Sequence, residues 1–336
     1  MSKLRFVLAV AVLGAFLSSP AAAAVAYTVT DLGQGQAYAV NNSGQAVGAI
    51  STGYGTTQAV LYNNGNVINI GAGNYSTATG INNAGLIIGQ GYFNGNPQGS
   101  KAGFVYSSGN MTYLSQDNAA VGINNFGQVV TDTNGLYANG YTWQTRTSIP
   151  INASGINDAG QIIGDSEGAS IYYNGTITHI PGTYFGHAYA INNAGQVVGI
   201  LNSRADGKNP GFIYSDGTTT DIGSLAVGFG ATPNAINNAG LVVGEALVPF
   251  YAITINRAFI YSNGTITDLN NLVDPNSGWN LQDATGINDN GQIVGYGIGP
   301  DGQQDAFLLT PTPEPATMGL LAIGLAALLA RRRQSA

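Results

Sequence analysis

Apolar and polar residues alternate along this chain in short runs, and its body lacks the three-to-four-residue spacing of amphipathic helices. In the clearest stretch, residues 258–261 and 265–269 are rich in β-branched and aromatic side chains and are separated by Ser-Asn-Gly. Further on, residues 284–288 and 292–296 flank a second turn, Asp-Asn-Gly. Runs of four to six such residues, bounded by Asn and Gly, are typical of β-strands. Each unit of this kind is therefore expected to supply four short strands.

A ten-residue phrase recurs seven times, which makes an internal repeat the dominant feature of the sequence. Successive copies begin 41, 42, 33, 35, 45 and 51 residues apart, so one unit averages about 41 residues. This length matches the ~40–45 residues of a four-stranded propeller blade, whereas the coils of a parallel β-solenoid are usually shorter. The sequence thus favours a β-propeller. The copies are AVNNSGQAVG (39–48), GINNAGLIIG (80–89), GINNFGQVVT (122–131), GINDAGQIIG (155–164), AINNAGQVVG (190–199), AINNAGLVVG (235–244) and GINDNGQIVG (286–295).

Each copy contains an Asn-Asn or Asn-Asp pair, followed by one residue and Gly. Asn or Asp opens a type I turn by hydrogen-bonding its own backbone, and Gly accepts the positive φ that follows, so turn geometry explains the pattern. Asn is also a ligand for carbohydrate or calcium, and equivalent loops of a ring converge on one face. Residues 288–291 are similar to a calcium loop but lack its run of carboxylates and its closing Glu. We expect no cofactor, with calcium as the alternative.

The two ends of the repeat region look like the halves of one further unit. Residues 28–33 match the strand at 265–269, which should follow an Ala-Phe-x-Tyr strand. Residues 305–309 match that preceding strand but have no successor. Joining the two halves would complete a blade and remove exposed strand edges, which a closed ring requires and an open solenoid does not. We therefore predict an all-β, seven-bladed propeller over residues 27–310, closed by its terminal strands.

The units resemble the HAF repeat of exported bacterial proteins. That repeat pairs a Gly-Ile-Asn-x-x-Gly-x-Val-x-Gly segment with a His/x-Ala-Phe-x-Tyr strand and a Thr-Asp-Leu-Gly strand. Residues 257–261 and 305–307 carry the match, without the family's histidine. The third unit departs most, because Thr131 stands where the other copies close with Gly and residues 136–149 fit the pattern poorly. The resemblance implies an exported repeat protein and supplies no catalytic residues.

Residues 1–26 have the order of a secretory signal peptide: Lys3 and Arg5, an apolar run from Phe6 to Leu17, then small residues. Ala24 and Ala26 each end an A-x-A pattern, so we expect cleavage after one of them. An uncleaved membrane anchor is the alternative.

Residues 311–336 form a second terminal segment, whose apolar run at 316–330 is shorter than the ~20 residues that span a bilayer comfortably. The arginines that follow it should stay cytoplasmic. With the Pro-Glu-Pro before it, the tail resembles the PEP-CTERM sorting signal of Gram-negative bacteria. The resemblance implies transient membrane anchoring, processing by an exosortase-type peptidase, and export to the cell envelope or the extracellular space. A plain C-terminal membrane anchor is the alternative. The sorting residues are Pro313, Glu314, Pro315, Arg331, Arg332 and Arg333.

Charge restricts the partners of the body. Only 8% of the residues are charged, against ~25% in ordinary soluble domains. Outside the terminal segments, five Lys and Arg oppose sixteen Asp and Glu, which gives a net charge of 5 − 16 = −11. So few cations cannot form the basic stripe that nucleic acid requires, and they disfavour anionic lipid surfaces. The chain has no cysteine, which excludes disulfides and thiolate chemistry.

Candidate functional residues lie mainly where the repeat is interrupted. Residues 245–256 and 271–279 are insertions, and insertions on one face of a ring are the usual place for binding. Within them, Tyr251 and Trp279 are candidates for stacking on sugar rings or anchoring a partner; filling space between blades is the alternative. The two histidines, His179 and His187, are too few for a zinc site, which needs three or four ligands.

Two functions fit these features. The first is an exported, non-catalytic repeat protein that binds or structures extracellular matrix, through exopolysaccharide or a surface protein. The second is a glycan hydrolase with paired carboxylates, ~5–10 Å apart, in the central channel. Several acids at one channel mouth would favour the hydrolase, whereas a lining of Ala, Gly and Val would exclude it. The sequence favours the first.

Overall fold

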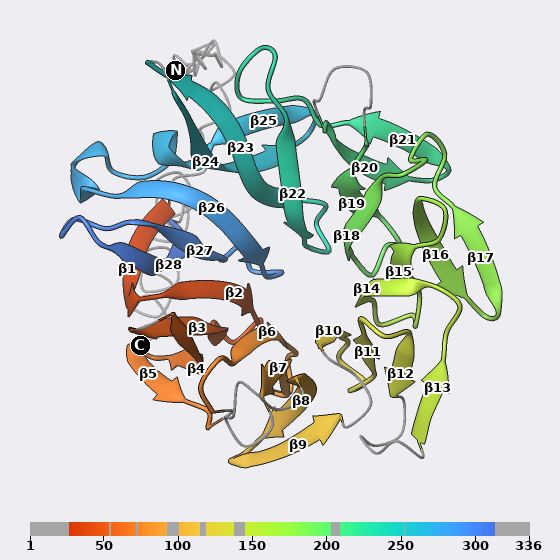
Figure 1. Cartoon of the computed structure of the whole chain (residues 1–336). Helices are drawn as coiled ribbons and strands as arrows, with labels where there is room; N and C mark the ends of the chain where they lie inside the picture. The colour runs from red at the N-terminus through yellow and green to blue at the C-terminus, as the bar shows by residue number, and fades with distance from the viewer. Residues whose placement is uncertain are drawn as a thin grey trace, which may run out of the picture. The chain divides into compact units, whose positions relative to one another are not determined.

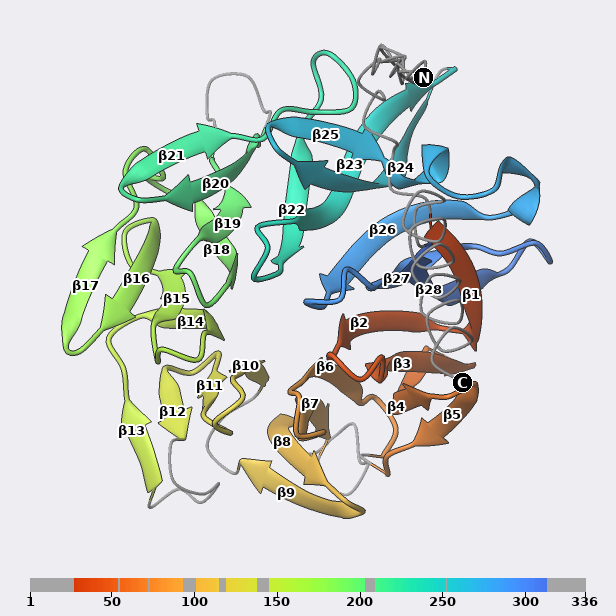
Figure 2. The ribbon, with the colours of Figure 1, turned by 180° about the vertical axis from the view of Figure 1, so that it is seen from behind.

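The computed structural model describes residues 27–53, 55–71, 73–92, 101–114, 119–137, 145–202, 209–251 and 253–312. These residues form seven four-stranded antiparallel sheets, arranged as the blades of a ring (Figures 1 and 2). The prediction of a seven-bladed β-propeller is therefore confirmed. The signal-cleavage candidates Ala24 and Ala26 and the sorting residues at 313–315 and 331–333 lie outside the described residues.

The four strands of a blade follow one another outward from the centre of the ring (Figure 1). The innermost strands are β2 (Gln36–Val40), β6 (Thr77–Ile81), β10 (Ala120–Ile123), β14 (Asn152–Ile156), β18 (His187–Ile191), β22 (Ala231–Ile236) and β26 (Asn280–Ile287). The second strands are β3 (Ala46–Gly53), β7 (Ile87–Tyr92), β11 (Val129–Thr131), β15 (Ile162–Asp165), β19 (Val197–Ile200), β23 (Val242–Phe250) and β27 (Ile293–Ile298).

The third strands are β4 (Thr56–Asn63), β8 (Lys101–Ser107), β12 (Gly135–Tyr137), β16 (Ala169–Tyr173), β20 (Gly211–Ser215), β24 (Ile253–Ser262) and β28 (Gln304–Pro311). The outer strands are β5 (Asn66–Asn69), β9 (Asn110–Leu114), β13 (Arg146–Ser148), β17 (Thr176–His179), β21 (Thr218–Asp221), β25 (Thr265–Asp268) and β1 (Tyr27–Gln34). Blades 1 to 6 run from β2–β5 to β22–β25, and blade 7 combines β26–β28 with β1. Two 3₁₀ turns, η3 (Leu269–Asn271) and η4 (Pro275–Ser277), follow β25. No helix within the described ranges is long and apolar enough to cross a bilayer.

Blade 7 is completed by the N-terminal strand, as predicted. β1 pairs antiparallel with β28, in a register that runs from Tyr27 opposite Pro311 to Gln34 opposite Asp305. The first residue of β1 is also tied to blade 6, because the Tyr27 N–H donates to the Leu272 carbonyl oxygen at 2.8 Å. The ring therefore closes through strand pairing between the two ends of the repeat region.

Blade 3 has four strands although its sequence departs from the repeat. In the other six blades a Gly closes the repeated phrase, because a Cβ there would collide with the innermost strand; at Gly295 it would lie 1.9 Å from the Asp283 carbonyl oxygen. Blade 3 has Thr131 instead. Its innermost strand starts at Ala120, directly opposite Thr131, whereas the innermost strands of the other blades extend at least one residue further. Thr131 is fully buried, and its Oγ1 accepts the Gly135 N–H at 3.0 Å.

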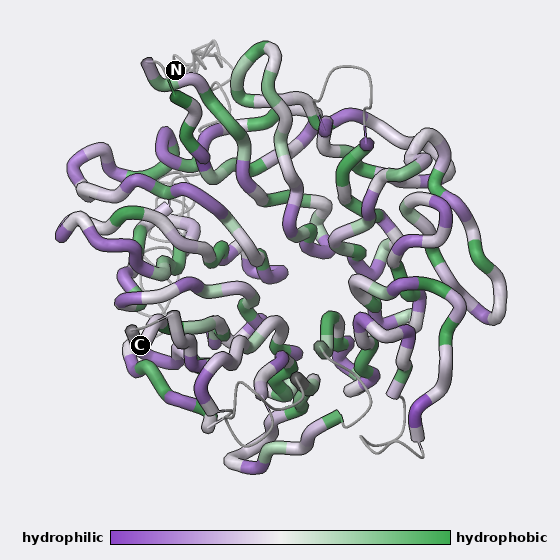
Figure 3. Tube along the Cα trace, viewed as in Figure 1, coloured by the Kyte–Doolittle hydropathy of each residue, from purple (hydrophilic) through white to green (hydrophobic). Residues whose placement is uncertain are grey.

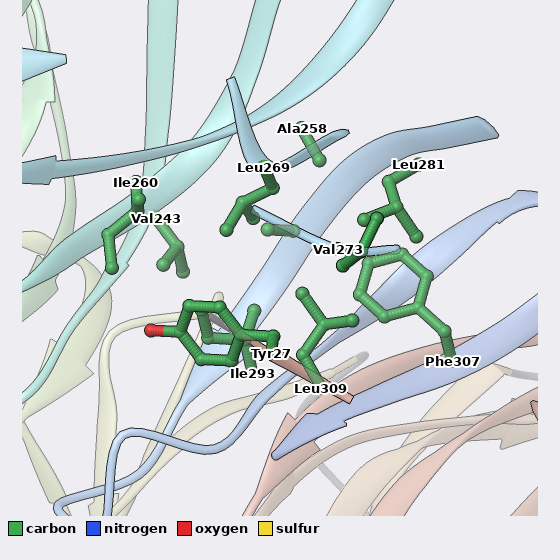
Figure 4. Close-up of a cluster of buried hydrophobic side chains, with 11 residues drawn as sticks. Tyr27, Val243, Ala258, Ile260, Leu269, Val273, Leu281, Ile293, Phe307 and Leu309 are labelled. Atoms are coloured by element: carbon green, nitrogen blue, oxygen red, sulfur yellow. The ribbon is translucent and has the colours of Figure 1, made fainter. Parts of the chain in front are cut away.

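The apolar core is divided among the contacts between blades, and each of its seven clusters takes side chains from two neighbouring blades. Apolar and polar stretches accordingly alternate along the blades (Figure 3). In the cluster of Figure 4, Val243 and Ile260 of blade 6 share one apolar cluster with Ile293 and Phe307 of blade 7. No cluster lies within a single blade, so each blade depends on its neighbours for burial of its apolar surface.

Replacing Phe307 by Ala should destabilise the ring strongly. The Phe307 side chain is fully buried, and removing it leaves a cavity between blades 6 and 7. Such substitutions cost about 3–5 kcal/mol. Phe126→Ala is the matched control, because that ring is 74% exposed; its cost should stay within about 0.5 kcal/mol. Urea unfolding followed by tryptophan fluorescence would measure both, and equal losses would contradict the assignment of the core.

Candidate functional site at the two ends of the ring

The seven turns between innermost and second strands form one end of the ring, here called the Asn end. In every copy the Oδ1 of the first Asn accepts the backbone N–H four residues on, as in the Asn192–Gln196 pair. Its Nδ2 donates to the carbonyl oxygen of the first Asn in the next blade, at 2.8–3.2 Å. These seven bonds form a closed circuit through Asn41, Asn82, Asn124, Asn157, Asn192, Asn237 and Asn288, all of them buried.

The second residue of each pair forms a parallel circuit. Its backbone N–H donates to the side-chain Oδ1 of the second residue in the next blade, at 2.8–3.0 Å. This circuit also closes, because Asp289 donates to Asn42 across the junction of blades 7 and 1. Its members are Asn42, Asn83, Asn125, Asp158, Asn193, Asn238 and Asp289.

The two circuits explain a detail that turn geometry does not. The first position must both accept and donate through its side chain, and among short side chains the Asn amide supplies both functions. The second position needs only an acceptor for the inter-blade bond, which Asn and Asp both provide. The sequence follows this difference: all seven copies have Asn at the first position, and two have Asp at the second. The turn explanation is therefore correct but incomplete.

The Asn end encloses a central depression lined by residues from all seven blades. Its two carboxylates are both held by amide groups. Asp158 accepts from the Asn125 and Asn193 side chains at 2.9 and 2.7 Å, and Asp289 accepts from Asn238 and Asn42 at 3.0 and 3.1 Å. Burial alone would raise the pKa of Asp158, but the bonds from Asn125 and Asn193 hold it below its usual range. Calcium at Asp289 would have to displace these donors.

The opposite end, where innermost strands begin and second strands finish, is here called the variable end. One pair of register partners per blade occupies it, and no two pairs are alike. The connections from second to third strands also lie here, including the β23–β24 hairpin. The pairs are Gln36–Ala49, Thr77–Gln90, Ala119–Asp132, Asn152–Asp165, His187–Ile200, Thr232–Glu245 and Asp283–Tyr296. These pairs include four acids, unlike the Ala, Gly and Val lining that would exclude a hydrolase.

Asp283 and Glu245 of blades 7 and 6 are electrostatically coupled at this end. Asp283 is 8% exposed and accepts from the Asn234 amide at 2.7 Å. Burial, and next the charge of Glu245, raise the pKa of Asp283 to about 7, against the opposing effect of hydrogen bonds from Tyr296 and Asn234. Burial also raises the pKa of Glu245, whose Oε2 accepts from Asn256. Local sequence gave no sign of this pairing.

The histidines occupy separate places. His187 Nδ1 lies 2.6 Å from Asp165 Oδ2, and its ring stacks with Tyr189 at a centroid distance of 6.5 Å and an interplanar angle of 18°. His179 Nδ1 lies 3.1 Å from the Oγ of Ser170, a fully buried residue. No group of three metal-ligating acids or histidines occurs among the residues that the structure describes.

The two aromatic candidates differ in their surroundings. Tyr251 is 96% exposed at the tip of the β23–β24 hairpin, where its ring contacts Phe250 edge to face. Trp279 is partly buried and packs edge to face on Phe307, at a centroid distance of 6.0 Å. Trp279 thus packs against the core between blades 6 and 7, whereas Tyr251 is exposed, and partner contact by either stays a prediction.

The fold is that of an all-β propeller, and sequence comparisons add an export signal. Residues 311–334 match the PEP-CTERM protein-sorting motif, which indicates an exported protein of the Gram-negative cell envelope and fits processing by an exosortase. Residues 176–307 match a family model described as a protein of unknown function (DUF3466). No curated protein sequence matches the chain.

Among solved structures, the chain is similar to TolB from Acinetobacter baumannii. The two share 9% sequence identity with a TM-score of 0.37, over 83% of this chain and 65% of the other.

Replacing Asn by Asp should destabilise the protein in the first circuit but not in the second, and the adjacent residues Asn82 and Asn83 test this difference. Asn82→Asp removes the donor to the Asn124 carbonyl oxygen and buries a charge, because Asn82 is 4% exposed. We expect a loss of at least about 2 kcal/mol in the free energy of unfolding. Asn83→Asp keeps the acceptor for the Asn42 N–H on an exposed side chain, so it should change stability by less than about 0.5 kcal/mol. Chemical denaturation measures both, and equal effects would refute the distinction.

Asp283→Asn should remove a pH dependence of stability. The pKa of Asp283 rises from 3.8 to about 7 on folding, so the folded protein retains a proton that the unfolded chain releases. Retention of this proton stabilises the folded state fully below about pH 4, and the stabilisation is lost as the pH rises toward 7. Asn has nearly the same shape as Asp but does not titrate. The melting temperature of the variant, relative to that of the wild type, should therefore rise as the pH increases over this interval. A difference independent of pH would contradict the shift.

Proposed function

We propose that this protein is an exported, non-catalytic propeller that binds polysaccharide at its variable end. The observation that carries the proposal is the contrast between the two ends of the ring. At the Asn end, side chains are committed to two closed hydrogen-bond circuits. At the variable end, each blade presents a different pair of residues, and insertions of the chain surround them. Binding surfaces of this kind are expected where loops vary on a rigid scaffold.

The chemistry of the variable end suits sugars. Carboxylate and amide groups hydrogen-bond hydroxyls, and aromatic rings stack on the apolar faces of pyranoses. Tyr189 is 37% exposed and lies against His187, which Asp165 orients. The net charge of −11 for the body disfavours acidic polymers, because they would be repelled. Neutral or amine-bearing polysaccharides are therefore the favoured ligands over acidic ones.

Coupling between Asp283 and Glu245 supports glycan hydrolysis as a second candidate function. The charge of Glu245 contributes to the raised pKa of Asp283, and a carboxyl with a raised pKa suits the role of general acid. The low accessibility of Asp283 argues for binding instead. Asp283 is 8% exposed and already accepts from Asn234 and Tyr296. A general acid must reach the glycosidic oxygen, so this environment suits a structural carboxyl better.

Affinity electrophoresis against soluble neutral and amino-sugar polysaccharides tests binding at the variable end. The wild type should be retarded by at least one polymer, and Tyr189→Ala should weaken that retardation about tenfold, or about 1.4 kcal/mol. Tyr173→Ala is the control: this tyrosine is 43% exposed, but it precedes the β16–β17 turn, which lies at the Asn end. Retardation by no polymer would refute the proposal. Release of reducing ends that Glu245→Gln abolishes would favour the hydrolase.

A further inference from the structure

A cavity of about 440 Å³ lies at the variable end of blade 6. This volume falls within the ~300–1,000 Å³ of small-molecule sites. Its walls come from four places: the β19–β20 connection of blade 5, the segment before β22, the start of β22, and the facing strands β23 and β24 of the hairpin. The residues that matter are Asn209, Phe229, Thr232, Glu245, Leu247 and Asn256. They provide amide and hydroxyl groups, one carboxylate and one aromatic ring.

Among the described residues that line the cavity, Glu245 is the one with a carboxylate. Its side chain is half-buried and accepts from Asn256, and Asp283 lies close enough behind it to be coupled electrostatically. Within the described part of the chain, neither carboxyl forms an ion pair with Lys or Arg. Burial disfavours the ionised form of Glu245, and a cationic ligand beside it offsets this effect because it supplies an opposite charge.

We propose that this cavity binds a sugar residue carrying a primary ammonium group, as part of an amino-sugar polysaccharide. The inference rests on the proposed function and names the ligand class of one site within it. The ammonium contacts Glu245, the hydroxyls exchange hydrogen bonds with Asn209, Thr232 and Asn256, and the ring lies against Phe229. A buried ammonium requires such a paired charge, whereas an acetylated amine would leave Glu245 without a cation.

The β23–β24 hairpin extends the site. Leu247 lines the cavity, and the strands continue in register from there to Phe250 opposite Ile253. Beyond Leu247 the hairpin has exposed apolar side chains and no charge: Phe250 is 48% exposed and Ile253 64%. Tyr251 lies four residues along this arm, about 13 Å from Leu247 at the rise of a β-strand. A polymer seated in the cavity can therefore stack further residues on the arm.

Isothermal titration calorimetry with the full exported chain tests the site, using a glucosamine pentamer and its fully N-acetylated counterpart as probes. The deacetylated pentamer should bind about tenfold more tightly, a difference of about 1.4 kcal/mol. Glu245→Gln should abolish that preference, while Tyr251→Ala should weaken both probes alike. Glu167→Gln is the matched control, because Glu167 is exposed and belongs to blade 4. Thermal melts check that each variant is folded.

Each outcome is decisive. Equal affinity for the two pentamers, or a preference that survives Glu245→Gln, overturns the inference; retained binding of either pentamer or of a neutral glucan still supports the proposed function. Binding of no saccharide at all defeats both. Tighter binding of oligolysine than of the deacetylated pentamer, lost in Glu245→Gln, would assign the cavity to a cationic peptide instead.

Discussion

The closed circuit of hydrogen bonds through the first Asn of each repeat is the constraint on which the ring depends. Each of these buried amides fixes its own turn and also reaches the next blade, so local geometry and the spacing between blades are set by the same side chain. Opening the circuit at one blade would leave a buried donor and a buried carbonyl without partners, which is costly in a low-dielectric interior. The circuit thus ties the turn of every blade to the turn of the next.

A scaffold held at one end leaves the other end free to differ from blade to blade. None of the fourteen residues that form the register pairs of the variable end belongs to one of the seven apolar clusters. These positions can therefore differ from blade to blade while the packing between blades is kept. This separation explains how a highly repetitive chain can present a different pair of side chains in every blade at one end of the ring.

The fold could be predicted from the sequence because its signals are local or lie at the ends of the chain. Strand runs, turn residues and the two half-units each indicate their own structure. The inter-blade circuits could not be predicted in this way, since they join residues between 33 and 51 positions apart, or 247 across the closure. Only the packed ring brings those turns together. Turn geometry accounts for an Asn pair within one repeat, but it does not account for the bonds between repeats.

The candidate site was less accessible to sequence analysis. Glu245 and Asp283 belong to different blades, and their proximity follows from how blades 6 and 7 pack. Both predicted aromatic contacts lie in insertions, yet Trp279 packs on Phe307 while Tyr251 is exposed. An insertion indicates where the repeat is broken, but whether it folds back onto the core or extends from it depends on the apolar surface available beside it.

The split seventh blade places ring closure and the sorting signal at the same end of the chain. β1 is the first strand of the ring in the sequence and its partner β28 is the last, and the match to the sorting motif begins where β28 ends. Without β28, β1 would have an unpaired edge. A chain that stops before β28 therefore lacks both the strand that completes blade 7 and the sorting motif, so the signal is present only in chains that contain every strand of the ring.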